Sequence, residues 1–370
     1  MRFHLSYVAL VLQAAQFTGA APAEDFSEKH PLRTLTPLGS VGNCKVTAKP
    51  RQAVPVDLET TPWIWTGEKA DAGAATDGAF RKSFDTPKGK CALFASILVG
   101  SDTSHTLFVN GKEIGRGAGF RRTSIYYVAL QPERNTFAIQ SHGNGPRSGV
   151  ASSVLVQYSD GSSYKIVTDN TWRQSAAAQP PTDWQLPEFD DNSWKASQSL
   201  GIRSKGGAAL PPMLEQHKAS RWVWTDNDKM PSLLFRKTIQ TPQGKRPVAA
   251  IVLMNVYGNY TFWANGAHVY TDENRDMSEA YFIPNVNDAT NIFAVKASTN
   301  TAHPGFIATI LLAYADGSND VFHSGTTWKV SDGEHKDFEN PGFDDSKWSA
   351  AVDKGAFGQH KWWSASLPDA

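Results

Sequence analysis

The sequence predicts an all-β protein that contains two tandem β-sandwich domains of the jelly-roll type. Three observations predict this fold class: short apolar runs rich in branched residues, Asn-Gly and Asp-Gly turns between them, and repetition of the whole pattern after about 155 residues. A helical spacing of apolar residues is hard to find over windows of about eleven residues. Regularly spaced short strands are typical of sandwiches and jelly rolls.

The repeat is visible in motifs that recur in the same order. The separation between the copies stays between 154 and 156 residues, so chance does not explain the register. A repeat of this length is domain-sized, whereas solenoid units have about 20–50 residues. The matched motifs are Phe80-Arg81-Lys82 with Phe235-Arg236-Lys237, Asn110-Gly111 with Asn265-Gly266, Asn135-Thr136-Phe137-Ala138 with Asn291-Ile292-Phe293-Ala294, Tyr158-Ser159-Asp160-Gly161-Ser162 with Tyr314-Ala315-Asp316-Gly317-Ser318, and Phe189-Asp190-Asp191 with Phe343-Asp344-Asp345.

The strands expected within the copies are apolar runs that end near turn residues. Asn110-Gly111 and Asp160-Gly161 follow two of these runs directly, which predicts hairpins. The runs cover residues 95–99, 106–109 and 152–158 in copy one and 248–254 in copy two.

The repeat and the composition of the joining segments give the expected organisation. We expect a signal peptide at 1–20, an N-terminal arm at 21–40, jelly-roll domain 1 at 41–212, a linker at 213–217 and jelly-roll domain 2 at 218–366. A Pro-Pro pair just before residue 213 suits a short linker.

The first residues of the chain are typical of a secretory signal. Arg2 and His4 precede the apolar run 5–15, and small residues at 18–20 suit cleavage. A short membrane anchor is the alternative, but the run is well below the roughly 20 apolar residues that span a bilayer. We therefore expect a secreted protein.

The composition excludes several classes of protein. Lys and Arg number 36 and Asp and Glu also number 36, so the net charge is zero. A neutral chain has no electrostatic reason to seek nucleic acid or an anionic membrane. With 40% hydrophobic and 19% charged residues, the chain is too apolar to be disordered. We expect no nucleic-acid partner and no membrane insertion.

Two covalent features are expected in an oxidising compartment. Cys44 and Cys91 can form a disulfide, which would close a loop of about 48 residues. Two buried free thiols are the alternative. Asn259-Tyr260-Thr261 matches the acceptor pattern for N-glycosylation.

Two tempting motifs are assigned to structure. Asp190-Asp191 and Asp344-Asp345 are adjacent carboxylates, whereas a glycosidase needs two carboxyl groups about 5–9.5 Å apart on opposite sides of a bond. We expect structural turns there, with a structural calcium as a further role for some of these residues. The glycine-rich run 115–119 lacks the spacing of the dinucleotide fingerprint, and we expect a flexible loop. Nothing assembles a nucleophile, a base and an orienting group, so we expect no enzyme.

The ordered motifs resemble a known family. Phe-Arg-Lys, an Asn-Gly turn, Asn-x-Phe-Ala, Tyr-x-Asp-Gly-Ser and Phe-Asp-Asp-x-x-Trp occur in both copies. This series resembles the galactose-binding-like jelly-roll modules that accompany catalytic domains in α-L-rhamnosidases and sialate esterases. It is similar above all to the calcium-dependent rhamnose-binding modules and to secreted mushroom lectins built from two such modules. The resemblance covers nearly the whole chain beyond residue 40. Its similarity to mushroom lectins indicates a fungal-like protein.

The resemblance implies a sugar site in copy one. The family places an Asp-Asn pair at the start of the strand that leads to the Asn-Gly turn, and this chain has Asp102 and Thr103 there. The family's stacking tryptophan corresponds to Phe120, and the next loop carries Asn144. The implied carbohydrate-binding residues are therefore Asp102, Thr103, Phe120 and Asn144. Asp102 is alternatively a turn residue that accepts local N–H groups, and Phe120 a core residue.

Copy two matches the family less well. It has Tyr257-Gly258 in place of the Asp-Asn pair, and Asn300 in the following loop. Tyr257 and Asn300 are therefore weaker candidates, and we expect copy two to be mostly structural or altered.

The residue types of copy one suit a sugar for chemical reasons. A sugar offers hydroxyl groups that need fixed donors and acceptors, and an apolar C–H face that packs on an aromatic ring. The Asp102 carboxylate can accept two hydroxyl hydrogens, or hold a calcium ion that binds neighbouring hydroxyls. The sequence leaves both options open, with Asp102 as the candidate calcium ligand.

The function expected is that of a secreted, non-catalytic, lectin-like protein for galactose- or rhamnose-type sugars, with self-association to raise avidity. Its partners would be cell-surface or wall glycans. The alternatives are an ancillary or relict module related to rhamnosidase-like glycoside hydrolases, and a structural extracellular protein without a sugar site.

The chain's twelve tryptophans are assigned mainly to framework packing. Eight of them occupy matched positions in copies whose candidate sugar residues differ. The matched pairs are Trp63 with Trp222, Trp65 with Trp224, Trp172 with Trp328, and Trp194 with Trp348.

Overall fold

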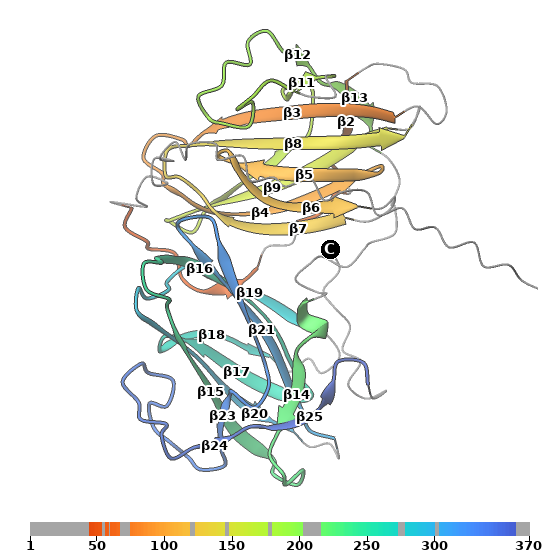
Figure 1. Ribbon diagram of the computed structural model, residues 1–370. Helices are drawn as coiled ribbons and strands as arrows, with labels where there is room; N and C mark the ends of the chain where they lie inside the picture. The colour runs from red at the N-terminus through yellow and green to blue at the C-terminus, as the bar shows by residue number, and fades with distance from the viewer. Residues whose placement is uncertain are drawn as a thin grey trace, which may run out of the picture. The chain divides into compact units, whose positions relative to one another are not determined.

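The computed structural model describes residues 44–53, 56–58, 60–66, 75–118, 123–144, 148–176, 180–202, 216–272, 278–299 and 303–359. Nearly all of the regular structure in these residues is β-strand, with one short helical turn at 216–218 (Figure 1). The strands form four antiparallel sheets, which we name after a central strand of each: the β4, β8, β16 and β20 sheets.

The first sandwich consists of the β4 and β8 sheets. The β4 sheet has the order β13 (Gln198–Gly201), β2 (Trp63–Trp65), β9 (Val150–Tyr158), β4 (Ala92–Ser101), β7 (Thr123–Ala129), with β10 (Ser163–Val167) also paired to β9. The β8 sheet has the order β12 (Lys195–Ala196), β11 (Arg173–Ser175), β3 (Ala75–Asp85), β8 (Arg134–Asn144), β5 (Ser104–Val109), β6 (Lys112–Ala118).

The second sandwich consists of the β16 and β20 sheets. The β16 sheet has the order β1 (Arg51–Gln52), β19 (Glu279–Ile283), β16 (Pro247–Val256), β21 (Phe306–Tyr314), β14 (Arg221–Trp224), β25 (Val352–Ala356), with β22 (Asn319–His323) also paired to β21. The β20 sheet has the order β18 (Ala267–Asp272), β17 (Asn259–Ala264), β20 (Thr290–Ser298), β15 (Ser232–Gln240), β23 (Lys329–Ser331), β24 (Ser349–Ala350).

Apart from β1, which has no counterpart in the β4 sheet, the two sandwiches repeat one another strand for strand. Strand β3 corresponds to β15, β4 to β16 and β8 to β20, and these strands take the same places in their sheets. The prediction of an all-β chain with two tandem β-sandwiches is confirmed.

The hairpin turns take the conformation that their residues favour. Asn110 and Gly111 both have positive φ, at 50° and 82°, which suits the two-residue turn between β5 and β6. Asn110 Oδ1 also accepts the Thr136 N–H at 2.8 Å, and Asn110 Nδ2 donates to Asn135 Oδ1 at 2.9 Å. Asn265 and Asn291 repeat this last contact at 2.9 Å in the second sandwich. The recurrence of these asparagines is therefore explained by one turn built twice.

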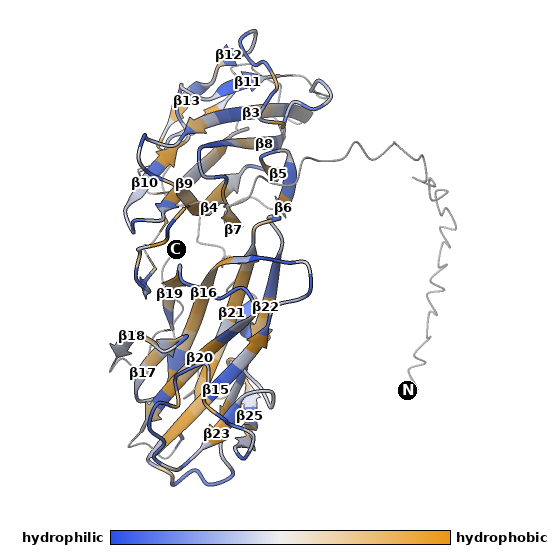
Figure 2. Cartoon of the chain, turned by 90° about the vertical axis from the view of Figure 1, so that its left-hand side faces the viewer, coloured by the Kyte–Doolittle hydropathy of each residue, from blue (hydrophilic) through white to orange (hydrophobic). Residues whose placement is uncertain are grey.

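The central strands are buried on both faces. Along β4, Ala95, Ile97 and Val99 contact the core of the first sandwich, because alternate side chains of a strand point to opposite faces. The residues between them are also covered, and Phe94 belongs to a second apolar cluster. Figure 2 shows the resulting apolar strands β4, β9, β16 and β21. The continuous hydrophobic runs in the sequence thus mark strands that are covered on both sides.

The second apolar cluster joins residues of both sandwiches. It combines Phe94 of β4 with Ile251 and Leu253 of β16 and with Phe282 of β19. The rings of Phe94 and Phe282 have centroids 5.4 Å apart. Burial of such side chains contributes on the order of 25 cal/mol per Å² of apolar surface removed from water.

A segment at the start of the described chain is attached to both sandwiches. Cys44 forms a disulfide with Cys91, with an S–S distance of 2.09 Å, so the predicted pairing is confirmed. Farther along, β1 pairs with β19, with Arg51 opposite Phe282. Residues 44–53 therefore connect a covalent link in the first repeat to a sheet of the second.

The tryptophan prediction is confirmed for most of the matched pairs. Trp172, Trp222, Trp224 and Trp328 are at most 1% exposed, and Trp65, Trp194 and Trp348 are also buried. The predicted signal peptide and N-terminal arm lie outside the described residues, as does the linker up to residue 215. No helix in the described part of the chain has the length and apolar character needed to cross a membrane.

Candidate functional site

Several strand ends of the first sandwich meet at one place. Ser104, the first residue of β5, pairs with Ala118 at the end of β6 and with His142 near the end of β8. Ser101, the last residue of β4, pairs with Val150 at the start of β9. We call this place the first loop end and define it as the described residues within 75–77, 100–105, 115–126 and 141–150.

The predicted residues Asp102 and Thr103 form the turn between β4 and β5 at the first loop end. Asp102 is half-buried and Thr103 is exposed. The Asp102 backbone N–H donates to Gly149 O at 3.0 Å, which fixes the turn to the start of β9. The Thr103 hydroxyl donates to Asp102 Oδ2 at 3.4 Å. A carboxylate and a hydroxyl are therefore held next to one another on the surface.

A second polar pair lies at the same end and was missed in the sequence. His142 Nδ1 is 2.7 Å from Asp77 Oδ1, and the side chains are 46% and 23% exposed. The two residues face each other across β3 and β8. Their counterparts in copy two are Ser232 and Ser298. Comparison of the copies for titratable residues present in only one of them would have revealed this pair.

A buried hydrogen-bonded chain supports the turn from below. Ser101 Oγ is 2.9 Å from His105 Nδ1, and His105 Nε2 is 2.9 Å from the Tyr126 hydroxyl. His105 is only 2% exposed, and burial lowers its pKa to about 4. Burial likewise raises the pKa of Tyr126 to about 12. Both side chains are therefore neutral at pH 7 and act as fixed dipoles beside Asp102.

The glycine-rich run explains how this chain is covered. Residues 112–118 form strand β6, so the expectation of a flexible loop for 115–119 is wrong over 115–118. A Cβ at Gly117 would lie 2.3 Å from His105 Cε1, and a Cβ at Gly115 would lie 2.6 Å from the Tyr126 ring. The glycines let the β6 backbone pass directly over the two rings.

The corresponding end of the second sandwich is built differently. Tyr257 takes the place of Asp102, and its N–H donates to Gly305 O at 2.8 Å, the same backbone contact. Its side chain packs against the apolar cluster of Trp222 and Ile307. A Cβ at Gly258 would lie 2.1 Å from Ser298 O, so glycine is required at this close backbone approach. Copy two keeps the turn but not the carboxylate.

The buried pair beneath this second turn consists of two tyrosines. Tyr260 and Tyr281 correspond to His105 and Tyr126, and their hydroxyl oxygens are 2.5 Å apart. Tyr270, which takes the place of Gly115, has its ring centroid 5.6 Å from that of Tyr281. An aromatic side chain thus fills the space that a glycine leaves in the first sandwich.

The other predicted residues are placed as follows. Phe120 and Asn300 lie outside the described residues, and so does the side chain of Asn144, the last residue of β8. Asn259 is the exposed first residue of β17. The structure therefore brings together Asp102 and Thr103 from the predicted set and adds Asp77 and His142.

The described residues at this end supply few carboxylates for a metal ion. In the described ranges, no group of three or more His, Cys, Asp or Glu side chains could hold a metal ion. Calcium prefers six to eight oxygen ligands, and Asp102 supplies one carboxylate.

The paired carboxylates of both copies are turn residues, as predicted. Asp190 Oδ1 accepts the Asn192 N–H at 3.0 Å, and Asp344 Oδ1 accepts the Ser346 N–H at 2.9 Å. This contact holds the pKa of Asp344 below its ordinary value. Asp190 and Asp344 both lie outside the first loop end.

Known proteins were compared with the chain. No family model matches it. An α-L-rhamnosidase of Streptomyces avermitilis is 23% identical over 348 residues, which cover 79% of this chain and 32% of the enzyme. The chain thus spans about a third of the length of this curated relative.

Two solved structures resemble the chain over most of its length. A lectin from Pleurotus ostreatus in complex with GalNAc is 37% identical, covers 88% of this chain and 100% of its own, and has a TM-score of 0.82. The apo form of Pleurotus ostreatus lectin is 38% identical, with 88% and 99% covered and the same TM-score. Identity of this degree over both whole repeats shows common descent as well as common fold. The chain belongs to the family of the Pleurotus ostreatus lectin.

Proposed function

We propose that this protein is a secreted, non-catalytic carbohydrate-binding protein whose sugar site is the first loop end. The observation that carries the proposal is the Asp102–Thr103 turn, half-buried at Asp102 and exposed at Thr103, held at the meeting point of β4, β5 and β9 in a chain of lectin descent. The ligands proposed are galactose- or rhamnose-type sugars.

The chemistry of the first loop end suits sugar hydroxyls. The Asp102 carboxylate accepts hydroxyl hydrogens, and the Thr103 hydroxyl both donates and accepts. The Asp77–His142 pair adds a further acceptor and donor at the rim. Charged acceptors form hydrogen bonds about twice as strong as neutral ones, so Asp102 would be the main anchor.

Differences between the repeats support a function in the first. The backbone turn is the same in both copies, but Tyr257 packs against an apolar cluster, whereas the half-buried Asp102 contacts the Thr103 hydroxyl. Since the turn forms in copy two with Tyr257, the turn itself does not require the carboxylate that copy one has at Asp102. The Asp102 side chain is therefore the feature that distinguishes a binding role from a framework role.

Secretion is part of the proposal. The Cys44–Cys91 disulfide fits an oxidising compartment, and the first twenty residues have the pattern of a signal peptide. A single shallow sugar site binds weakly, so we propose that self-association on glycan-bearing surfaces raises the avidity.

The test is glycan-array binding and titration calorimetry with galactose, GalNAc and L-rhamnose, using the full chain with and without EDTA. We expect Asp102→Ala to weaken binding at this site about tenfold or more, because it removes a charged acceptor. The matched control is Asp85→Ala, at the opposite end of β3, whose side chain is 76% exposed. Loss of binding in EDTA would assign calcium to the site.

Two results would overturn the proposal. One is an absence of binding to any glycan in both conditions. The other is equal binding by the wild type and Asp102→Ala. Hydrolysis of aryl rhamnosides or release of acetate from acetylated sugars would instead favour the alternative of an enzyme relative.

A further inference from the structure

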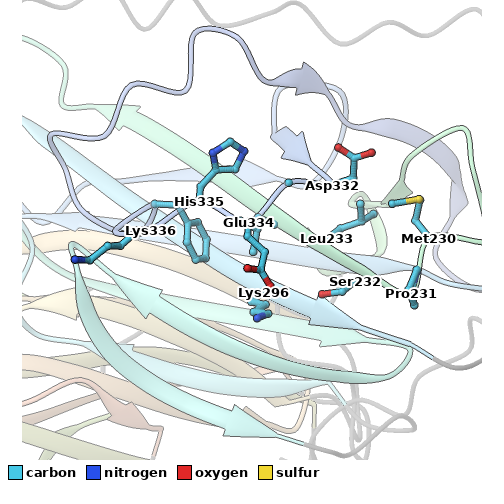
Figure 3. Close-up of a pocket in the computed structure, with 12 residues that line it drawn as sticks. Met230, Pro231, Ser232, Leu233, Lys296, Asp332, Glu334, His335 and Lys336 are labelled. Carbon is cyan, nitrogen blue, oxygen red and sulfur yellow. The ribbon is translucent and has the colours of Figure 1, made fainter.

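The second sandwich has a hollow of about 600 Å³ on the β20 sheet (Figure 3). Its walls come from three places: the start of β15 with the residues just before it, Lys296 of β20, and the loop that follows β23. Small-molecule sites in proteins are typically about 300–1,000 Å³. The hollow is therefore large enough to hold a small ligand.

The inner wall of the hollow is apolar. Leu234 is 6% exposed and Phe338 is 5% exposed. Both belong to one cluster with Trp348, which is 7% exposed. The ring centroids of Phe338 and Trp263 are 5.4 Å apart. An apolar wall of this kind suits the C–H face of a ligand.

The rim offers charged groups of both signs in equal number. Lys296 and Lys336 are exposed cations, and Asp332 and Glu334 are exposed carboxylates. A rim without excess charge does not select a charged ligand. It presents strong acceptors and strong donors around one opening, which is what a ligand with several hydroxyl groups requires.

His335 has an oriented ring at this rim. Ser331 Oγ accepts the Gly333 N–H at 3.2 Å and lies 2.8 Å from His335 Nε2. This contact fixes the ring through Nε2, so Nδ1 is the ring nitrogen that can donate to or accept from a ligand. The ring also packs on Trp348, with centroids 5.1 Å apart.

The first repeat lacks the residues that shape the hollow. Leu234 corresponds to Ala79, and Phe338 to Trp184, which stacks on Trp194 at 5.8 Å. Lys296 corresponds to Gln140, an uncharged residue that pairs with Ala79 as Lys296 pairs with Leu234. The hollow is thus a property of copy two, although its wall at 230–232 corresponds to residues 75–77 of the first loop end.

From this geometry we propose that the hollow between β15, β20 and the loop after β23 binds a neutral saccharide. The apolar face of one sugar ring lies on Leu234 and Phe338, and its hydroxyls bond to Lys296, Glu334 and His335 Nδ1. The protein is then a lectin with two chemically different sites. This site is independent of Asp102 and of the first loop end.

Methionine-methyl NMR on the full chain tests the proposal directly. Met230 lines the hollow, whereas Met254 is fully buried in the core of the same sandwich and serves as the internal control. The chain has five methionines, so the spectrum of the ¹³C-methyl-labelled protein is simple, and Met230→Leu assigns the signal. The probes are galactose, GalNAc and L-rhamnose, added separately in the Asp102→Ala background.

We expect at least one of these sugars to shift the Met230 methyl signal in a saturable way, while Met254 does not move. Lys296→Ala with Glu334→Gln should raise the apparent Kd about tenfold or more. Lys347→Ala, which removes an exposed cation outside the hollow, should leave it unchanged. Both substitution sites are exposed, so the fold should be retained.

Three outcomes would overturn the inference. The first is a Met230 signal that stays fixed with all three sugars. The second is a shift of equal strength in the Lys296→Ala/Glu334→Gln protein. The third is a shift that only a charged sugar such as glucuronate produces. The proposal for the first loop end is judged separately, because Asp102→Ala is present throughout. Sugar binding by the wild type that disappears in Asp102→Ala upholds that site and rejects this one.

Discussion

Arg81 and Asp191 form an ion pair 3.0 Å long in which the guanidinium is almost completely buried, with 1% of the side chain exposed. Arg81 also donates to Leu186 O at 2.9 Å and to Phe189 O at 3.2 Å. One side chain of β3 thus holds the whole segment before β12. Arg236 and Asp345 repeat the pair at 2.5 Å in the second sandwich. The recurring Phe-Arg-Lys and Phe-Asp-Asp motifs are therefore the two halves of one contact.

Removal of the carboxylate should destabilise the first sandwich. Asp191→Ala leaves the buried Arg81 guanidinium without its counter-charge, and we expect the free energy of unfolding to fall by about 3 kcal/mol. Asp190→Ala is the control, since this neighbour accepts only a local N–H, and it should cost about 1 kcal/mol. Urea unfolding followed by tryptophan fluorescence measures both. Equal losses for the two variants would show that the ion pair contributes nothing of its own.

The buried His105 should make the protein less stable in acid. Burial lowers its folded pKa to about 4, whereas an unfolded histidine titrates near 6.5, so the unfolded state binds the proton first. Stability is therefore full above about pH 6.5 and declines as the pH falls toward 4, by roughly 3 kcal/mol for this residue. His217, whose pKa burial lowers to about 3, acts in the same direction.

His105→Tyr tests this assignment with a residue that the second sandwich already uses at the same position, Tyr260. The variant keeps a hydroxyl near Tyr126 but does not titrate in this range. We expect a flatter loss of unfolding free energy between pH 6.5 and 4, measured by urea titrations at several pH values. An unchanged slope would mean that other groups carry the acid sensitivity.

The glycine at position 117 should not tolerate a side chain. A Cβ there would lie 2.3 Å from His105 Cε1 and 2.6 Å from Ser124 Oγ. Gly117→Ala should therefore lower the midpoint of thermal unfolding and reduce the free energy of unfolding by about 1–3 kcal/mol. Gly325→Ala is the matched control, because no heavy atom lies within 4 Å of a Cβ at that site. A harmless Gly117→Ala would show that β6 can move away from the buried rings.

Loss of the disulfide should weaken the fold by a different route. In the chain-entropy account, a cross-link between residues 47 positions apart stabilises the protein by about 4 kcal/mol. Cys44→Ser/Cys91→Ser should therefore unfold at lower urea concentration than the oxidised wild type. The Ala53 amide, which donates to Ala280 O at 2.8 Å in β19, should also exchange its hydrogen with solvent faster in this variant. Unchanged exchange there would show that β1 stays attached without the covalent link.

The fold could be predicted from the sequence because the same strand and turn motifs occur in two copies. Two copies in register identified the strands, the Asn110-Gly111 turn and the buried tryptophans, each from local patterns of a few residues. The ion pair of Arg81 with Asp191 could not be predicted in this way, because the two residues are 110 positions apart and local patterns do not specify long-range contacts. The pairing of β1 with β19 was missed for the same reason.

The candidate sites, in contrast, depend on residues that differ between the two copies. Asp102 was found through a family pattern, but Asp77 and His142 were not, because they occur in one copy only and the search followed shared motifs. The hollow at Lys296 depends on the loop after β23, whose path over the β20 sheet no local pattern specifies. Residues that differ between duplicated domains are therefore the place to look for function.

The short strand β1 has a consequence for how molecules of this protein meet one another. Without it, β19 would be the last strand of its sheet, with unpaired backbone groups along an edge that another chain could extend. Arg51 and Gln52 cover that edge beside Phe282, and the Arg51 guanidinium lies 6.0 Å from the Phe282 ring centroid. The Cys44–Cys91 bond ties this cover to the first repeat. Reduction of the bond is therefore expected to loosen the cover and to favour association of molecules through the β19 edge.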